Sequence, residues 1–373
     1  MDDPYGRPAP FGPLVADCHM APLARPGQDI TFDELQLATR NRGMPLEGLH
    51  YDITPVGMHY LLVHFDIPSV DVGDWRLRVG GAVDRPVELA IAEIRSRPEV
   101  TIPVTMECAG NGRARLDPRP ISQPWLVEAV GTAEWTGTPL AGLLQEAGLA
   151  DDAVEIVFTG ADRGIESGIE HDYQRSLTIS EASRPEILLA WAMNGRDLEP
   201  QHGYPLRLIV PGWYGMASVK WLTGIDAVTA PFAGYQQATA YRYQESRDEP
   251  GEPVTRIRVR ALMIPPGIPD FRTRSRFVDG GAVTVTGRAW CGTELVAGVE
   301  LGVDGHWQPA VLDEAPGPWA WRRWSCSWEA VPGDHVLACR AIDADGNIQP
   351  GEAPWNLQGM GNNLVQEVAV SVR

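Results

Sequence analysis

The sequence has few cysteines, no long apolar run and no export signal at its start. Five cysteines in 373 residues form no C-x-x-C pair, which argues against a structural zinc site, and their odd number argues against a disulfide framework. No apolar run reaches the roughly 18 residues that a membrane span needs. The first residues, MDDPYGRPAP, lack the basic and apolar regions of a signal peptide and contain no twin arginine. We therefore expect a cytoplasmic protein without a membrane span.

Basic residues are scarce relative to acidic ones. The chain has 31 Lys and Arg against 49 Asp and Glu, which gives a formal net charge of −18. Such a charge opposes the approach of nucleic acids and anionic membrane surfaces, so neither is an expected partner. Hydrophobic residues at 44% and charged residues at 21% are ordinary for a globular chain, and the length predicts about two domains.

Proline and glycine, at 32 and 39 residues, predict many turns and therefore short elements. Residues 1–50 look like an N-terminal arm, with one helix over 32–40 that Thr31 caps with Glu34 three residues later. Residues 51–250 interleave strand patterns with short helices. The clearest patterns there are strands over 60–65, 75–79, 154–158 and 206–210 and helices over 89–94 and 140–147.

After a Pro-rich acidic segment over 245–270, helical patterns almost vanish. Alternating strands over 283–286, 299–303 and 336–341, with an Asp304-Gly305 hairpin turn, predict a β-sandwich over 251–373. The predicted fold class is α+β: a mixed α/β domain followed by an immunoglobulin-like β-sandwich.

The most unusual motif is ECAGNGR, residues 107–113. Cys108 follows a strand-like run and enters a turn whose glycines allow close approach of the backbone to a bulky group. Composition alone favours an inert buried cysteine. Arg113 nearby favours a thiolate instead, which serves either as a nucleophile or as a soft metal ligand. Spacing does not choose between these roles.

Two further motifs carry clustered cations. HGYPLRLIVPGWYGMASVKWL, residues 202–222, places Arg207 on a strand and Lys220 after a Gly-rich loop, an arrangement that suits a phosphate but also a solvated surface strand. WAWRRW, residues 319–324, alternates arginine with tryptophan, for which simple cation–π packing is a sufficient explanation.

Together these strings resemble the sulfite oxidase family of molybdenum enzymes, from about residue 50 to the end. ECAGNGR is similar to its cysteine loop, and the 202–222 motif to its cofactor-binding strand and loop. WAWRRW, CRAIDADGNIQP and PWNLQGM look like its dimerisation domain. The resemblance implies a molybdenum–molybdopterin cofactor with Cys108 as the molybdenum ligand. It implies cofactor contacts from His64, Cys108, Asp162, His202, Arg207, Ser218 and Lys220.

The resemblance also implies an anion pocket formed by Arg113, Trp125, Tyr243 and Arg322, with Tyr241 as a competitor for the tyrosine. Arginines there would reverse the field of an acidic protein for an entering oxyanion. One position departs from the family pattern, because Leu62 stands where the family has an arginine. Arg115, Arg175 and Arg242 are the candidates to compensate. Loss of a charge-assisted contact of ~1.5–3 kcal/mol would weaken binding of a small dianion.

The implied activity is two-electron oxidation of sulfite, or a related sulfur oxyanion, by oxo transfer at molybdenum. No haem module is expected, so the electrons pass to a separate acceptor such as a cytochrome, and the β-sandwich forms a homodimer. An alternative keeps the cofactor but changes the substrate to an organosulfur compound, a sulfoxide or another oxyanion because of Leu62. A third hypothesis is a non-catalytic scaffold that retains the fold.

Overall fold

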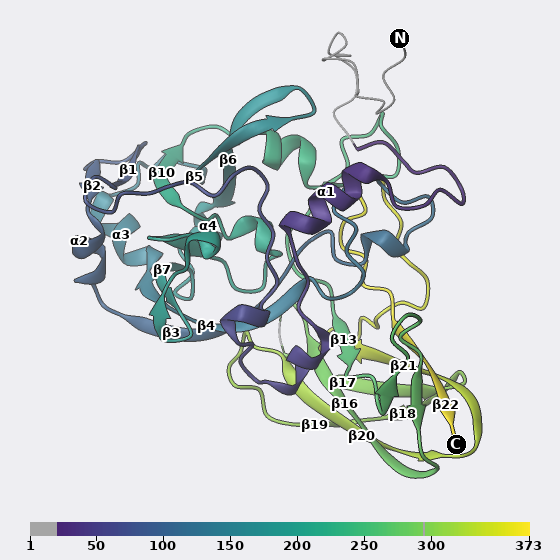
Figure 1. Cartoon of the computed structure of the whole chain (residues 1–373). Helices are drawn as coiled ribbons and strands as arrows, with labels where there is room; N and C mark the ends of the chain where they lie inside the picture. Colours follow the sequence, from purple (N-terminus) through teal and green to yellow (C-terminus); the bar gives the residue numbers. More distant parts are fainter. Residues whose placement is uncertain (1–20, 294) are drawn as a thin grey trace, which may run out of the picture.

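Short strands dominate the structure, a computed structural model that describes residues 21–293 and 295–373. Figure 1 shows two bodies, one of purple-to-teal elements and one of green-to-yellow strands at the lower right. In the described ranges no helix is both long enough and apolar enough to cross a membrane. Cys18 lies outside these ranges, and the described cysteines Cys108, Cys291, Cys326 and Cys339 form no disulfide.

Two sheets build the N-terminal body. The first has the strand order β2-β1-β10-β5-β6, and the second has the order β3-β4-β7-β8 with β9 paired to β7. The strands of the first sheet are β1 (Leu77–Gly81), β2 (Val87–Leu89), β5 (Glu155–Glu166), β6 (Ile169–Thr178) and β10 (Leu222–Val228). Those of the second are β3 (Val100–Glu107), β4 (Val130–Pro139), β7 (Leu188–Met193), β8 (Arg196–Asp197) and β9 (Arg207–Ile209).

Helices of this body are short and pack beside the sheets. They are α1 (Phe32–Arg40), α2 (Ile91–Arg95), α3 (Leu140–Ala147) and α4 (Ile179–Ala182), with single turns at Leu46–His50, Val56–Met58, Arg113–Arg115, Pro200–His202, Gly215–Ala217 and Gln236–Ala240. A two-stranded ribbon follows, made of β11 (Arg242–Tyr243) and β12 (Glu252–Pro253). In α3 the apolar face, Leu140, Leu143, Leu144 and Ala147, is buried in the main core.

The C-terminal body consists of two further sheets. One has the order β13-β16-β20-β19 and the other β14-β15-β22-β21-β17-β18. Their bounds are β13 (Arg260–Met263), β14 (Ile268–Pro269), β15 (Arg276–Val278), β16 (Gly281–Trp290), β17 (Gly298–Val303), β18 (His306–Pro309), β19 (Val311–Leu312), β20 (Arg322–Ala330), β21 (Gly333–Ile342) and β22 (Gln366–Val372). Val285 and Trp324 of one sheet share a core with Leu301 and Leu337 of the other. The immunoglobulin-like assignment of this pair stays a prediction.

Several predicted elements are confirmed. Thr31 and Glu34 form a capping box at the start of α1, and the Asp304-Gly305 turn joins β17 to β18 with positive φ at both residues. The strand predicted over residues 60–65 is wrong. Only Leu61 pairs with another backbone segment, in a single antiparallel bridge with Arg42. Val63 N donates to Asn41 Oδ1 and the Leu62 carbonyl accepts from a lysine, so side chains take up the next backbone groups.

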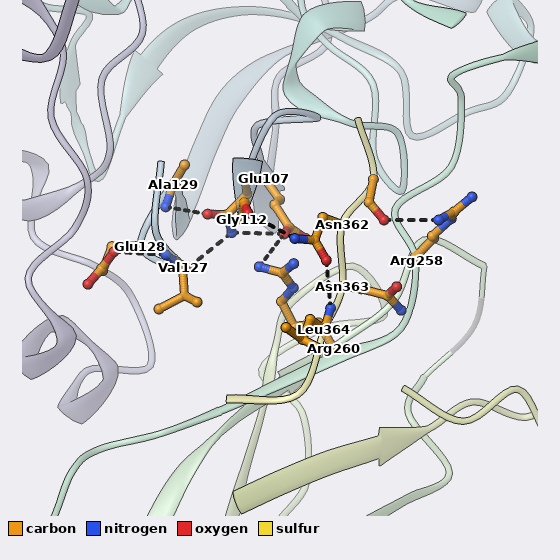
Figure 2. Close-up of polar contacts among 12 residues, drawn as sticks. Glu107, Gly112, Val127, Glu128, Ala129, Arg258, Arg260, Asn362, Asn363 and Leu364 are labelled. Carbon is orange, nitrogen blue, oxygen red and sulfur yellow. Dashed lines mark hydrogen bonds and ion pairs between the residues drawn. The ribbon is translucent and has the colours of Figure 1, made fainter. Parts of the chain in front are cut away.

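The two bodies meet at the end of β3. There the buried carboxylate of Glu107 forms an ion pair with Arg260 of β13, with Nη1 and Oε1 3.2 Å apart. Trp290 Nε1 donates to the other oxygen of Glu107 at 2.8 Å. Figure 2 shows this carboxylate between the loop after β3 and the C-terminal segment, where Asn362 Nδ2 donates to the Gly112 carbonyl at 2.8 Å. The C-terminal body thus holds the loop that carries Cys108.

Candidate active site

Cys108 is the first residue after β3, in a tight turn. Its backbone N–H donates to the Ala129 carbonyl at 2.9 Å, and its own carbonyl accepts from Asn111 N at 3.0 Å. Asn111 also donates to the Glu107 carboxylate. Gly112 has φ +91°, and a side chain there would collide with Asn362. The sequence GNG is therefore what allows β3 to end in a turn that leaves Cys108 beside two cavities.

The first cavity encloses about 620 Å³, part of it open to solvent, and Cys108 lies on its wall. The structure brings together here every side chain that the sequence analysis assigned to the cofactor. They are His64, Cys108, Asp162, His202, Arg207, Ser218 and Lys220. His64 precedes β1, Cys108 follows β3 and Asp162 lies in β5, while the other four come from residues 202–220 around β9. Only the fold brings these segments together.

Arg207 is buried and Lys220 half-buried in this cavity, and among the described residues neither has a carboxylate within ion-pair distance, although the charge of Asp162 acts on Lys220 from farther away. Arg207 donates to the carbonyls of His202 at 2.9 Å and Ser218 at 3.1 Å. Lys220 Nζ donates to the Leu62 carbonyl at 2.7 Å. Arg207 is thus a buried cation without a counterion, which is costly, and with Lys220 beside it this wall fits a bound anion such as a phosphate.

Burial shifts the ionisation of these groups toward their neutral forms. It lowers the pKa of Lys220 to about 7 and that of Arg207 to about 10, and it raises the pKa of Asp162 to about 6. Asp162 Oδ1, His202 Nε2 and Arg207 Nε are buried and have no hydrogen-bond partner in the described part of the chain. Donors and an acceptor left unpaired around one cavity fit a ligand that carries both an anionic group and amino groups.

Three histidines surround the same space in neutral form. Burial lowers the pKa of His59 to about 4, of His64 to about 3 and of His202 to about 2. The rings of His59 and His202 meet edge to face with centroids 5.9 Å apart. His59 belongs to this wall, although no sequence pattern marked it.

A metal bound at Cys108 would need donors from outside the chain. Within residues 21–293 and 295–373 no group of three or more His, Cys, Asp or Glu side chains could hold a metal ion. Burial raises the pKa of the Cys108 thiol, and the charge of Arg113 opposes that rise. Burial is the larger cause, so Arg113 alone does not make the thiolate. A site with one thiolate fits a metal that arrives with its own sulfur donors.

The second cavity, about 1120 Å³ with its open part, shares Leu62, His64, Cys108 and Tyr241 with the first. Arg113 and Trp125, both predicted for the anion pocket, line it. Cys108 thus lies at the junction of the two cavities.

Arg113 is held by neutral groups. Its Nε donates to the Gln358 carbonyl at 3.0 Å, its Nη1 donates to Ser122 Oγ at 3.2 Å, and its Nη2 contacts Met360 Sδ at 3.4 Å. Because sulfur is a weak acceptor, Nη2 keeps donor capacity toward the cavity.

Tyr241, and not Tyr243, contributes the tyrosine of this cavity. Its hydroxyl lies 2.8 Å from His64 Nε2. Tyr243 is absent from both cavity walls in the described chain and packs under the Arg258 guanidinium, 4.5 Å from its ring centroid. Tyr241 ends the turn at Gln236–Ala240, with ψ near 72°, and Tyr243 lies two residues later in β11. Strand alternation would place both side chains on one face, so the bend at Tyr241, which no sequence pattern marks, is what separates them.

Arg322 is also not brought to the site. It begins β20, pairs with Ala289 of β16, and donates to the carbonyls of Val296 and Asp313. The C-terminal body contributes Gln358 and Met360 to the second cavity instead. Both belong to the PWNLQGM string, whose position in sequence gave no sign of which residue would face the pocket.

None of the three arginines considered as substitutes for the charge missing at Leu62 lines either cavity, as far as the structure describes the chain. Arg115 is exposed, and Arg242 donates to the Gly251 carbonyl. Arg175 is buried behind Tyr241, with its guanidinium carbon 5.4 Å from the ring centroid. The second cavity therefore holds one arginine, Arg113.

Comparisons with known proteins agree with this geometry. The family model of the oxidoreductase molybdopterin binding domain matches residues 64–236, and that of the Mo-co oxidoreductase dimerisation domain matches residues 268–373. Sulfite oxidase of Gallus gallus is 31% identical over 336 residues, which cover 83% of this chain and 71% of that protein. The NADH nitrate reductase 1 of Oryza sativa subsp. japonica is 31% identical over 87% of this chain.

The chain spans 38% of the length of that nitrate reductase. Among solved structures, the sulfane dehydrogenase SoxCD of Paracoccus pantotrophus aligns with a TM-score of 0.74 at 22% identity, over 98% of this chain and 96% of that one. At this identity the likeness shows a shared fold. On the relatives and the two matched domains, the chain belongs to the sulfite oxidase family of molybdenum-dependent oxidoreductases.

Proposed function

We propose that the protein is a molybdopterin-dependent oxidoreductase that oxidises a sulfur compound by two electrons with transfer of an oxygen atom. One observation carries the proposal: seven side chains from distant segments line a single cavity at Cys108, and their unpaired donors and cations call for an anionic ligand. The second cavity at the same cysteine supplies a place for the substrate.

In this proposal the cofactor lies in the first cavity. Arg207, Lys220, Ser218 and His202 hold its phosphate, and Asp162 accepts hydrogen bonds from its amino groups. Cys108 is the thiolate ligand of molybdenum. When bound, the cofactor supplies a metal centre that exchanges oxygen and takes up two electrons.

The chain's own residues orient the substrate. Arg113 Nη2 donates to an oxygen of the substrate, and the Trp125 ring, buried at the wall, excludes water from one side. His64 is neutral, so its Nε2 accepts the proton of the Tyr241 hydroxyl and holds that hydroxyl at the junction of the two cavities. From there the Tyr241 hydroxyl oxygen can accept a hydrogen bond from a protonated oxygen of the reacting group or from a water that joins it.

Sulfite is the first candidate substrate, by analogy with the sulfite oxidases among the relatives. The second candidate is another substrate on the same cofactor, such as an organosulfur compound, a sulfoxide or another oxyanion. Leu62 favours this second candidate, because it leaves the cavity with one arginine, and a single arginine binds a small dianion weakly. A nitrate reductase is as similar to this chain as the sulfite oxidase is. The second candidate therefore includes the reduction of an oxyanion.

The partners follow from the same family. We propose a homodimer formed through residues 268–373, a separate electron acceptor such as a cytochrome, and a cytoplasmic location. Size-exclusion chromatography with light scattering tests the dimer.

Molybdenum and pterin analysis of protein from a host that makes the cofactor tests the proposal, together with sulfite-dependent dye reduction. Stoichiometric molybdenum is expected in the wild-type protein. Cys108→Ser should lose turnover and most of the metal and keep its circular dichroism spectrum, whereas Cys326→Ser, in the C-terminal core, should keep both. Absence of molybdenum from the wild-type protein, or full activity of Cys108→Ser, would refute the proposal.

A further inference from the structure

The second cavity carries one positive and one negative side chain. Of the Asp, Glu, Lys and Arg residues that the structure describes, Arg113 and Glu166 alone line it. The other polar side chains that line the cavity are uncharged amides and hydroxyls or His64, and they include Gln123, Gln236 and Gln358. Several cationic side chains would raise the affinity of a site for a small inorganic dianion, and a carboxylate would lower it. One arginine with one carboxylate therefore indicates a different ligand.

Glu166 and Gln236 form the acceptor side of the cavity. Glu166 ends β5, and its Oε2 accepts from Gln236 Nε2 at 2.8 Å. Gln236 is 1% exposed. Its Nε2 also lies 3.0 Å from His171 Nε2, and His171 Nδ1 lies 3.0 Å from the Ile169 carbonyl.

These contacts fix the orientation of the Gln236 amide. His171 Nδ1 faces a carbonyl and must donate, so its Nε2 accepts in the neutral ring. Gln236 Nε2 therefore uses both of its protons, one toward Glu166 and one toward His171. The opposite atom, Gln236 Oε1, is buried and has no partner among the described residues. A buried acceptor without a donor costs free energy until a ligand supplies one.

The donor side of the cavity lies near Cys108. Arg113 keeps donor capacity at Nη2, while Leu62 and Met360 add no charge. The cavity thus offers a hydrogen-bond donor, Arg113, to an oxygen atom of a ligand near the thiol. It offers two hydrogen-bond acceptors, Glu166 and Gln236, elsewhere on its wall.

We propose that this cavity binds an organic zwitterion, a sulfur oxyanion at one end with a protonated amine at the other, the amine being recognised by Glu166 and Gln236. An aminoalkyl sulfinate has this form as the substrate, and two-electron oxidation with transfer of one oxygen atom to its sulfur gives the aminoalkyl sulfonate as the product. The inference deepens the proposed function, on which it rests for the sulfur group, by naming the substrate class. Glu166 discriminates by attracting the ammonium group and by repelling a second negative charge.

Three sulfonates that differ only at the far end test the inference by isothermal titration calorimetry on purified, metal-analysed protein. The probes are 2-aminoethanesulfonate, 2-hydroxyethanesulfonate and ethanesulfonate. We expect the amine to bind at least about tenfold more tightly than ethanesulfonate, with the alcohol between them, as a charge-assisted hydrogen bond would give.

Glu166→Gln is the test variant, and Glu170→Gln is its matched control. Both lie on the same β5–β6 hairpin, but the Glu170 side chain is 62% exposed and pairs with Arg163. Glu166→Gln should reduce the preference for the amine to less than about threefold, and Glu170→Gln should keep it. Melting temperatures verify that both variants fold.

Equal affinity for the three probes, no binding of any probe, or an undiminished preference in Glu166→Gln would overturn the inference. Failure of the proposed function has a different outcome. Protein that lacks molybdenum and pterin but still prefers the amine refutes the cofactor assignment alone, whereas loaded protein without the preference refutes the zwitterion alone.

Discussion

His64 Nε2 and the Tyr241 hydroxyl lie 2.8 Å apart, although 177 residues separate them in the chain. Both side chains line both cavities. The Arg175 guanidinium carbon lies 5.4 Å from the Tyr241 ring centroid. Since burial lowers the pKa of His64 to about 3, the imidazole is neutral and can accept the phenolic proton. The hydroxyl is thereby held where cofactor and substrate would meet.

The first prediction separates the two tyrosines. Tyr241→Phe should lower kcat with sulfite by about a hundredfold, because it removes the hydroxyl that links the reacting group to His64 by hydrogen bonds. Tyr243→Phe is the control, since Tyr243 lies under Arg258 and outside both cavities. Steady-state dye reduction measures both. A similar loss in the two variants, or full activity in Tyr241→Phe, would contradict the assignment of Tyr241.

The residues assigned to the cofactor could be placed through the family resemblance, whereas residues without such a resemblance could not. Cys108, Arg207 and Lys220 belong to the two motifs on which the family resemblance rests, and they meet in one cavity. Glu166 sits at a hairpin end with no motif around it. Its relation to Gln236 depends on how β6 and the turn at 236–240 pack together, which no local pattern encodes.

The fold shows the same limit. The capping box of α1 and the Asp304-Gly305 turn were predictable because each is set by neighbouring residues. The segment over 60–65 alternates like a strand, yet it forms only a single bridge, from Leu61 to Arg42, because the side chains of Asn41 and Lys220 take up its next backbone groups. The position of Arg322 was equally hard to predict from the sequence, since it depends on the register of β20 against β16.

The second prediction concerns the ion pair between Glu107 and Arg260 (Figure 2), both of whose side chains are 2% exposed. Glu107→Gln leaves the Arg260 charge buried without a counterion, so it should lower the free energy of unfolding by about 3–5 kcal/mol. Urea titration followed by tryptophan fluorescence measures the loss.

The matched control for this pair is Glu170→Gln, which breaks an exposed ion pair with Arg163 and should cost less than about 1 kcal/mol. Glu107→Gln should also make the Cys108 thiol more reactive toward a thiol reagent in cofactor-free protein, since Asn111 loses a charged acceptor. If the two variants unfold at the same urea concentration, the ion pair does not hold the two bodies together.

The third prediction is a loss of stability in acid that comes from buried histidines. Burial lowers the pKa of His64 to about 3, against an ordinary value of 6.5. Below pH 6.5 the unfolded chain takes up a proton that the folded site refuses. The free energy of unfolding therefore falls with pH by about 1.4 kcal/mol per unit for this group, until the folded pKa is reached. His59 and His202 add to the loss in the same direction.

His64→Gln isolates one histidine from the carboxylates that titrate in the same range. In cofactor-free protein the variant should lose about 2–3 kcal/mol less than wild type between pH 6.5 and 4.5, because it removes one group with this pKa shift. The exposed His306 provides the control, and His306→Gln should follow the wild-type curve. Urea titrations at a series of pH values give the slopes. Parallel curves for wild type and His64→Gln would mean that His64 takes up its proton as readily in the folded protein as in the unfolded chain. The phenolic proton of Tyr241 would then have no neutral acceptor, and the part given to this pair in the proposed chemistry would fail with it.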